Sequence, residues 1–205
     1  MAAKEYLPQL TPLSCMTVLT CITDAWRKVL SQEPYKDAVV LLTAHSAFET
    51  GQWGRCPNYN FAGIKAIGDQ DYAIWTTHEG DAHPSSYQGH FRAYASKEEG
   101  ATGFVTFLAK NTRYAKAWQS LANDADPQAY GHLLKEAGYY TGNEIIYCAA
   151  LKRLWDWVAL QALGYSSDKA GCLAFQQAHP DQLTADGIFG PISRAVAKKI
   201  LRDSR

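Results

Sequence analysis

The sequence predicts a mainly α-helical protein with one small β-hairpin and a three-helix module at its C-terminal end. Helix start and stop signals recur along most of the chain. Strand-favouring residues on both sides of a polar connection occur in residues 71–94. A new set of turn and cap residues begins near Gly164. We therefore expect a larger domain over residues 1–160 and a small module over residues 161–205.

Two helices are expected near the start of the chain. The first begins at Thr11-Pro12, a capping threonine before a proline at the first helical position, and ends near residue 30. The second covers about residues 35–50, and Gly51 supplies a C-terminal stop. Glu49 then lies in the last turn, where the helix dipole disfavours a carboxylate. The presence of a carboxylate at this position therefore needs another explanation, and a catalytic role is one.

The later elements follow from similar signals. Residues 55–69 form a loop with a short extended piece, and the hairpin at 71–94 has a long polar connection of the kind that often carries function. Ser96 opens a capping box and a helix to about residue 110, and Asp126-Pro127 opens another helix. Residues 143–160 form an amphipathic helix. The residues available for burial on it are Ile146, Ala149, Ala150, Leu154, Trp157 and Val158.

The C-terminal module has its own helix caps and turn residues. A serine cap opens a short helix to about His179, Asp186-Gly187 forms a turn, and Gly190-Pro191 starts the last helix. About fifty residues make a small core, so the module should lean on the helix before it.

Composition argues against several classes of protein. Lys+Arg and Asp+Glu are equal at 20 each, so the basic excess of a nucleic-acid binder is missing. No apolar run is long enough to span a membrane, and we expect no membrane insertion. The five cysteines are odd in number and lack a C-x-x-C spacing, which favours buried free thiols. The histidines form no compact ligand set. We expect no metal, no cofactor and a monomer.

Glu49 is the candidate catalytic residue. His45 lies one helical turn earlier, and the aromatic residues Phe48 and Trp53 flank it. Apolar surroundings disfavour the charged form of a carboxyl group, and a protonated carboxyl is what a general acid at a glycosidic bond requires. The alternative is a solvated glutamate at a helix end. Aromatic residues make up 12% of the chain and offer rings that stack on sugars.

A second carboxylate is generally needed by glycosidases. The hairpin supplies Glu79, with Asp71 and Asp81 nearby in sequence. The alternative is that Glu79 and His78 only keep the loop soluble. A serine nucleophile at Ser46 is not expected, because adjacent residues on a helix point apart.

Four segments occur in the order of a known enzyme family. They are SAFETGQWG (46–54), NYNFAGIKA (58–66), FRAYASKEEGATGFVTFLAKNTRYAKAW (91–118) and AGYYTGNEIIYCAALKRL (137–154). Over about residues 10–160 the chain resembles the glucosaminidase family of bacterial autolysins and of the flagellar rod-cap enzyme. In the second segment, Asn60-Phe61-Ala62-Gly63-Ile64-Lys65 has one extra residue inside the family motif. The resemblance implies a lysozyme-like fold and cleavage of the glycan strand of peptidoglycan.

The resemblance also implies roles for particular residues. Glu49 is the general acid. Glu79 is the second catalytic group, although a one-residue gap decides whether Glu79 or His78 aligns with the family carboxylate. Water attacks the anomeric carbon with help either from Glu79 or from the N-acetyl group of the substrate. The implied substrate-binding residues are Trp53, Tyr59, Asn60, Phe61, His78 and Tyr139.

The C-terminal segments AFQQAH (174–179) and LTADGIFGPISRAV (183–196) resemble a peptidoglycan-binding module. A binding module tethered to a hydrolase raises its local concentration on the polymer. The expected function is therefore an endo-β-N-acetylglucosaminidase that acts on peptidoglycan glycan strands as a cell-wall lysin. A lytic transglycosylase or a muramidase on the same fold is the nearest alternative. A non-catalytic wall-binding or phage-tail structural protein is the alternative of another class.

The N-terminal stretch MAAKEYLPQL has no basic region followed by an apolar run, so no signal peptide is visible. We expect synthesis in the cytoplasm and action on the cell wall, as a phage endolysin, a tail lysin or an exported effector. Of these, a phage-type lysin is favoured.

Overall fold

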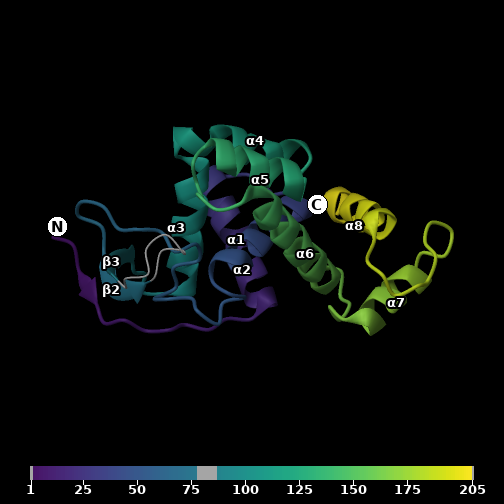
Figure 1. The fold of residues 1–205 in the computed structure, drawn as a ribbon, viewed down its shortest axis with the longest axis horizontal. Helices are drawn as coiled ribbons and strands as arrows, with labels where there is room; N and C mark the ends of the chain where they lie inside the picture. Colours follow the sequence, from purple (N-terminus) through teal and green to yellow (C-terminus); the bar gives the residue numbers. More distant parts are fainter. Residues whose placement is uncertain (1, 78–86, 205) are drawn as a thin grey trace.

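The computed structural model describes residues 2–77 and 87–204, and this part of the chain is mainly helical (Figure 1). The elements in chain order are β1 (Glu5–Tyr6), α1 (Cys15–Leu30), α2 (Lys36–Glu49), β2 (Tyr72–Thr77), β3 (Tyr87–Arg92), α3 (Lys97–Ala109), the 3-10 turn η1 (Thr112–Tyr114), α4 (Ala115–Asn123), α5 (Pro127–Glu136), α6 (Glu144–Ala162), α7 (Lys169–Gln177) and α8 (Pro191–Asp203). The small sheet lies at one end of the molecule and α7 and α8 lie toward the other (Figure 1). The predicted mainly α class with a small hairpin is confirmed.

Helix α2 is the central rod of the larger domain. All residues from 37 to 47 are buried, and the helix packs against α1 and α6. A helix that is buried on every side is held from all directions. Its last residue, Glu49, is therefore presented by a rigid element, and Thr50 and Gly51 end the helix as the sequence predicts.

Helix α1 begins later than predicted. It starts at Cys15, and the side chain of Ser14 caps it, so the predicted start at Thr11-Pro12 is wrong. Thr11 instead joins the N-terminal segment to a loop. Its hydroxyl donates to the carbonyl oxygen of Cys56 at 2.9 Å and accepts from the backbone N–H of Tyr59 at 2.8 Å. A buried polar side chain is satisfied by the nearest partner, and here that partner is 45 residues away.

The hairpin is confirmed, and it gains an unpredicted strand. β2 and β3 are antiparallel, with a register that runs from Tyr72 opposite Arg92 to Thr77 opposite Tyr87. The two-residue strand β1 pairs with β2 in parallel. The predicted extended piece within residues 55–69 is reduced to two isolated bridges, Leu10–Pro57 and Lys65–Phe91. His78 and Glu79 lie outside the described residues.

Helix α3 begins with the predicted capping box. The Ser96 hydroxyl accepts from the backbone N–H of Glu99 at 3.2 Å, and the Glu99 carboxylate accepts from the backbone N–H of Ala95 at 3.1 Å. One turn later, Gly100 lies against the loop at Tyr59. A Cβ added at Gly100 would collide with the backbone oxygen of Tyr59.

The Gly100→Ala variant should therefore be destabilised by about 1–3 kcal/mol, because overpacking against a backbone oxygen outweighs the better helix propensity of alanine. Urea unfolding measures the change. The matched control is Gly142→Ala, since a Cβ there meets nothing within 4 Å. Equal stability of Gly100→Ala and the wild-type protein would contradict this account of the close approach.

Helix α6 turns a different face to the core than predicted. Leu154 and Val158 are buried as predicted, Ala150 and Trp157 are half-buried, and Ile146 and Ala149 are exposed. The buried face is completed by Tyr147, Cys148, Leu151 and Trp155. This face packs against α2 and α5. Apolar residues occupy more than one side of this segment, so its periodicity did not determine the rotation of the helix.

Within residues 161–204 two helices, α7 and α8, follow directly from α6 (Figure 1), so the predicted number of three helices in the C-terminal module is wrong. The cap of α7 is Asp168 rather than a serine. Its carboxylate accepts from the backbone N–H of Gly171 at 2.9 Å, and Ser166 donates its hydroxyl to that carboxylate at 2.7 Å. The serine therefore does not cap the helix itself, and instead hydrogen-bonds to the aspartate that does.

Buried Gln176 joins the two segments of this module quoted above, residues 174–179 and 183–196, by hydrogen bonds. Its amide nitrogen donates to the Asp186 carboxylate at 2.8 Å, and its amide oxygen accepts from the backbone N–H of Gly187 at 2.8 Å. Gly187 has a φ of +73°, which favours glycine. The predicted Asp186-Gly187 turn is confirmed, and Gln176 holds it against α7.

Helix α8 is attached to the larger domain by three ion pairs, each to a different part of that domain. Three of its four basic residues reach α6, the end of α4 and α2. The pairs are Arg194–Asp156 at 2.5 Å, Lys198–Asp124 at 2.6 Å and Arg202–Asp37 at 2.9 Å. The module therefore rests on several elements of the larger domain, beyond the single preceding helix that we expected it to use.

All five cysteines are buried and free, which confirms the prediction from their number and spacing. Burial raises the pKa of Cys15 to about 12 and that of Cys56 to about 11, so both thiols stay protonated at neutral pH. Within residues 2–77 and 87–204, no helix combines the length and the apolar character needed to cross a bilayer.

Candidate active site

Glu49 is the last residue of α2, and its side chain is 22% exposed. One carboxylate oxygen, Oε1, accepts a hydrogen bond of 3.0 Å from the hydroxyl of Tyr147 on α6. The same oxygen lies 3.5 Å from Nε2 of His45, one turn earlier on α2. The carboxylate is thus held from inside the protein and is partly open to solvent, as a group that meets a substrate must be.

The tyrosines around Glu49 remain hydrogen-bond donors over a wide pH range. Burial raises the pKa of Tyr147 well above its usual value, and the nearby Glu49 charge raises it further. Burial and then Glu49 also raise the pKa values of Tyr139 and Tyr130. Each of these phenols is therefore protonated at neutral pH, so Tyr147 donates to the carboxylate and never competes with it for a proton.

His45 lies beneath Glu49 and is fully buried. Its Nδ1 atom is 2.9 Å from the hydroxyl of Tyr130 on α5. Three rings meet the imidazole near edge-on, those of Phe104 on α3 at 5.5 Å, Tyr130 at 5.6 Å and Tyr139 at 4.9 Å between ring centres. The imidazole therefore has one fixed orientation.

Tyr147 is fixed by rings on two sides. Tyr140 stacks on it with ring centres 3.7 Å apart, and Phe48 meets it near edge-on at 4.6 Å. Tyr140 also donates its hydroxyl to the Gly131 carbonyl at 3.1 Å. The position of the donor to Glu49 is therefore determined by α2, α6 and the loop after α5 together.

The segment that carries Tyr139 is held by Arg113. The guanidinium donates to the carbonyl oxygens of Ala137 and Gly138, the latter at 3.1 Å. Gly138 has a φ of +65°, and a Cβ there would press on the guanidinium. The ring of Tyr114 lies 5.6 Å from that of Tyr139. The quoted segments 91–118 and 137–154 therefore meet in space, and together they place Tyr139 beside His45.

Three of the predicted substrate-binding residues lie in the interior. Trp53, Asn60 and Phe61 are 1%, 0% and 0% exposed. Trp53 Nε1 donates to the Ser46 hydroxyl at 3.0 Å, and Ser46 donates to the Phe61 carbonyl at 2.7 Å. The Asn60 amide accepts from the backbone N–H of Ile64 and donates to its carbonyl. The prediction that these three side chains contact a substrate directly is wrong, because their surfaces face the core. Their hydrogen bonds and burial give them a structural role.

The other predicted binding residues are placed differently. Tyr139 is half-buried beside His45, as described above. Tyr59 is half-buried and lines a separate cavity of about 380 Å³ together with residues of the N-terminal segment and Tyr94. His78 and Glu79 lie outside the described residues. Binding of substrate by Tyr59 and Tyr139 stays a prediction.

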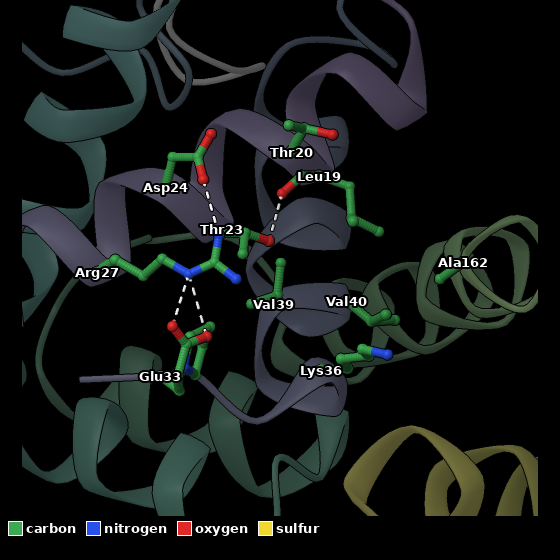
Figure 2. Close-up of a pocket in the computed structure, with 11 residues that line it drawn as sticks. Leu19, Thr20, Thr23, Asp24, Arg27, Glu33, Lys36, Val39, Val40 and Ala162 are labelled. Carbon is green, nitrogen blue, oxygen red and sulfur yellow. Dashed lines mark hydrogen bonds and ion pairs between the residues drawn. The ribbon is translucent and has the colours of Figure 1, made fainter. Parts of the chain in front are cut away.

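A further cavity of about 270 Å³ lies between α1 and α2 (Figure 2). Arg27 spans its wall and pairs with Asp24 and Glu33, each at 2.9 Å. Ala162 at the end of α6 also lines it. No predicted site residue lines this cavity. Among residues 2–77 and 87–204, no group of three or more His, Cys, Asp or Glu side chains is arranged to hold a metal ion.

His45, Tyr130 and Tyr147 were not assigned roles from the sequence. His45 lies one turn before Glu49, and the i, i+4 spacing on a helix is the signal that its side chain reaches the carboxylate. Tyr147 lies within the quoted segment 137–154, but its contact with Glu49 spans 98 residues. Tyr130 lies outside the quoted segments, and local sequence carries no sign of its pairing with His45.

A mainly α fold with one partly exposed glutamate at the end of a buried helix, inside a shell of aromatic rings, defines the class of helical glycosidase domains. The family model described as Glucosaminidase, mannosyl-glycoprotein endo-beta-N-acetylglucosaminidase, matches residues 27–170, more than half of the chain. The chain belongs to this family.

Two curated relatives carry the name peptidoglycan hydrolase FlgJ. The protein of Escherichia coli (strain K12) is 31% identical over 112 residues, which cover 49% of this chain and 34% of that protein. The protein of Pseudomonas aeruginosa is 34% identical over 112 residues, which cover 49% and 27%. The matched part of the chain thus spans about a third or less of the length of these relatives.

Two solved structures are similar to this chain. The glycoside hydrolase domain of FlgJ from Salmonella typhimurium has a TM-score of 0.49 at 25% identity, and the match covers 74% of this chain and 91% of that one. The peptidoglycan hydrolase from Sphingomonas sp. A1 has a TM-score of 0.51 at 24% identity, with 68% and 83% covered. The second likeness shows a shared fold, which agrees with the lysozyme-like class expected from the sequence.

Proposed function

We propose that the protein hydrolyses the glycan strand of peptidoglycan as an endo-β-N-acetylglucosaminidase, with Glu49 as the general acid. The observation that carries this proposal is the Glu49 carboxyl at the end of a buried helix, partly exposed and bonded to Tyr147 within a shell of aromatic rings. The glucosaminidase family match supports the reaction type, and the names of the curated relatives support the polymer.

In the proposed reaction, Glu49 gives its proton to the glycosidic oxygen of the leaving sugar. Negative charge then develops on the carboxylate, where the Tyr147 hydroxyl is already directed. A preorganised donor of this kind stabilises the transition state because it need not reorient during the reaction. Water attacks the anomeric carbon along one of two routes, helped by Glu79 or by the N-acetyl group of the substrate.

The C-terminal module, residues 161–205, is proposed to bind the cell wall and keep the enzyme on its polymer. Exposed Ile188 and Ile192, 67% and 68% accessible, lie at the start of α8 beside half-buried Phe189 and support this assignment. We further propose that the protein acts as a monomer at the wall. The phage-type lysin expected from the sequence is the setting that we propose for it.

The ends of the released glycan fragments test the reaction. Purified peptidoglycan is incubated with the full chain and the fragments are reduced and analysed by mass spectrometry. Reducing N-acetylglucosamine ends are expected. Reducing muramic acid ends would identify a muramidase instead, and anhydromuramic ends a lytic transglycosylase. No fragments across about pH 4 to 8, a range that brackets carboxyl and imidazole titration, would favour a wall-binding or structural protein.

A further inference from the structure

The buried pair His45–Tyr130 has one hydrogen-bonding group with no partner, and that group faces Glu49. His45 Nδ1 is 2.9 Å from the Tyr130 hydroxyl. His45 Nε2 is buried and has no formed hydrogen bond among the described residues. Glu49 Oε1 lies 3.5 Å from this nitrogen, which is longer than a formed hydrogen bond.

Counting protons assigns the tautomer of His45. Tyr130 is 1% exposed, and its hydroxyl is bonded to His45 alone among the contacts of residues 2–77 and 87–204. If Nδ1 carried the imidazole proton and donated it, the phenol proton would be buried without an acceptor, at a cost of about 1–3 kcal/mol. The phenol therefore donates to Nδ1. The neutral ring then carries its proton on Nε2, the atom that faces Glu49.

We propose that His45 is a positioning residue for Glu49, which Tyr130 holds in the tautomer that turns an Nε2–H toward Oε1. This inference rests on the proposed function of Glu49 as the general acid. His45 acts through the carboxylate and does not itself touch the substrate.

The arrangement separates the two oxygens of the Glu49 carboxyl. Oε1 accepts from the Tyr147 hydroxyl and faces the His45 Nε2–H, so two donors point at one atom. If Oε1 were protonated, its proton would lie close to the protons of both donors and would repel them. The acid proton therefore resides on Oε2, which has no partner within the described parts of the chain, and it leaves from Oε2 to the glycosidic oxygen.

The His45 Nε2–H stabilises the Glu49 carboxylate as that proton leaves. Charge that spreads onto Oε1 draws Nε2–H closer, and catalytic hydrogen bonds that are long in the free enzyme commonly tighten in this way. The groups that face the imidazole are Glu49 on α2, Tyr130 on α5, Tyr139 in the loop after α5, and the uncharged ring of Phe104 on α3. Burial raises the pKa values of both tyrosines, so the two phenols facing the imidazole stay protonated and uncharged near neutral pH.

The first test compares His45→Leu with His45→Gln in the full chain, on solubilised peptidoglycan fragments. His45→Leu should lower kcat by about ten- to a hundredfold, less than the loss for a fully formed oxyanion donor, with little change in KM. Without the donor, the protonated carboxyl persists to higher pH, so the basic limb of the pH–rate profile should move upward. His45→Gln should recover most of both changes, because its amide N–H can stand near the position of Nε2.

The matched control is His132→Gln. His132 is a 52% exposed histidine that bonds to Glu144 at 2.9 Å, and its loss should leave kcat and the profile unchanged. A folded His45→Leu protein with wild-type kcat and an unmoved basic limb would overturn the proposal. Equal losses in His45→Leu and His45→Gln, with no movement of the limb, would also overturn it, because a packing defect explains that pattern.

A second measurement does not depend on activity or on the folding of a His45 variant. In protein with ¹⁵N-labelled histidine, the imidazole spectrum identifies which ring nitrogen carries the proton. We expect His45 to be the Nε2–H tautomer, and Tyr130→Phe, which keeps the ring and removes the donor, should change that signal. An Nδ1–H tautomer in the wild-type protein would overturn the proposal. Failure of the wild-type protein to cut peptidoglycan would refute the proposed function, and the spectrum would still decide the orientation of His45.

Discussion

Replacing Glu49 with glutamine should lower the rate of glycan cleavage by at least about a hundredfold, the lower end of what general acid catalysis contributes. The amide keeps the shape of the side chain and still accepts from Tyr147, but it has no proton acidic enough to give to the leaving oxygen. Glu49 is 22% exposed at a helix end, so the fold should survive. Release of reducing ends from peptidoglycan measures the rate, and a thermal melt checks the fold.

The matched control is Glu136→Gln, a 52% exposed glutamate that lies 3.4 Å from His132. It should retain the wild-type rate. A folded Glu49→Gln protein with a near-normal rate would refute the central assignment.

Glu79→Gln distinguishes the two routes of water attack. The loss should be smaller than for Glu49→Gln if the N-acetyl group of the substrate attacks the anomeric carbon, because Glu79 then only stabilises charge. A loss as deep as that of Glu49→Gln would instead support a second catalytic carboxylate. Both rates are measured on the same peptidoglycan preparation.

Arg202→Leu should destabilise the protein by about 3–5 kcal/mol, because it leaves a buried carboxylate without its partner. Asp37 on α2 is 0% exposed, and Arg202 on α8 donates to it at 2.9 Å. Arg202 also donates to the carbonyls of Ala122 and Asn123 at the end of α4, and its guanidinium lies 3.8 Å from the centre of the Tyr35 ring. For a protein of this size, the melting temperature should fall by roughly 6–20 °C.

The effect should depend on pH in a defined direction. Burial raises the pKa of Asp37 above its usual value, and Arg202 opposes that rise. A raised pKa in the folded state means that folding favours the protonated carboxyl, so stability falls as pH rises above the unfolded value near 3.8. Without Arg202 this loss is larger. The difference between Arg202→Leu and the wild-type protein should therefore be greatest near neutral pH and should shrink toward pH 4.

Two further variants make this prediction specific. Lys199→Ala removes an exposed ion pair with Asp203 on the same helix and should change stability by no more than about 0.5 kcal/mol. Adding Asp37→Asn to Arg202→Leu removes the buried charge and should recover part of the loss. If Arg202→Leu is as stable as Lys199→Ala at neutral pH, the pair does not anchor the C-terminal module.

Local interactions account for what the sequence alone determined. Glu49 ends α2 because an apolar run precedes it and Gly51 adopts a φ of +57°, a conformation that favours glycine. Ser96 and Asp126 cap their helices through bonds to residues three positions ahead. The hairpin follows from strand-favouring residues on both sides of a polar connection. Each of these features depends on neighbours within a few residues, which sequence patterns record.

The tertiary structure alone decided which side chains meet Glu49 and which lie in the core. Trp53 shares a motif with Glu49, and Asn60 and Phe61 belong to the next motif, yet all three are buried by a loop that folds back on α2. The rotation of α6 brings Tyr147 to the carboxylate across 98 residues of chain. A helix with apolar residues on several sides has no single inward face until its neighbours are placed, so this rotation has no signature in the sequence.

The attachment of the C-terminal module depends on the same kind of distant contact. Arg202 and Asp37 are separated by 165 residues, and each lies in a segment that reads locally as an ordinary helix. Turn and cap residues predicted that a small module begins near Gly164, because such signals are local. Packing of the helices brings basic residues of α8 to buried or partly buried carboxylates on α2 and α6. Residues so far apart in the sequence can pair only when the helices lie side by side, so local patterns do not predict these ion pairs.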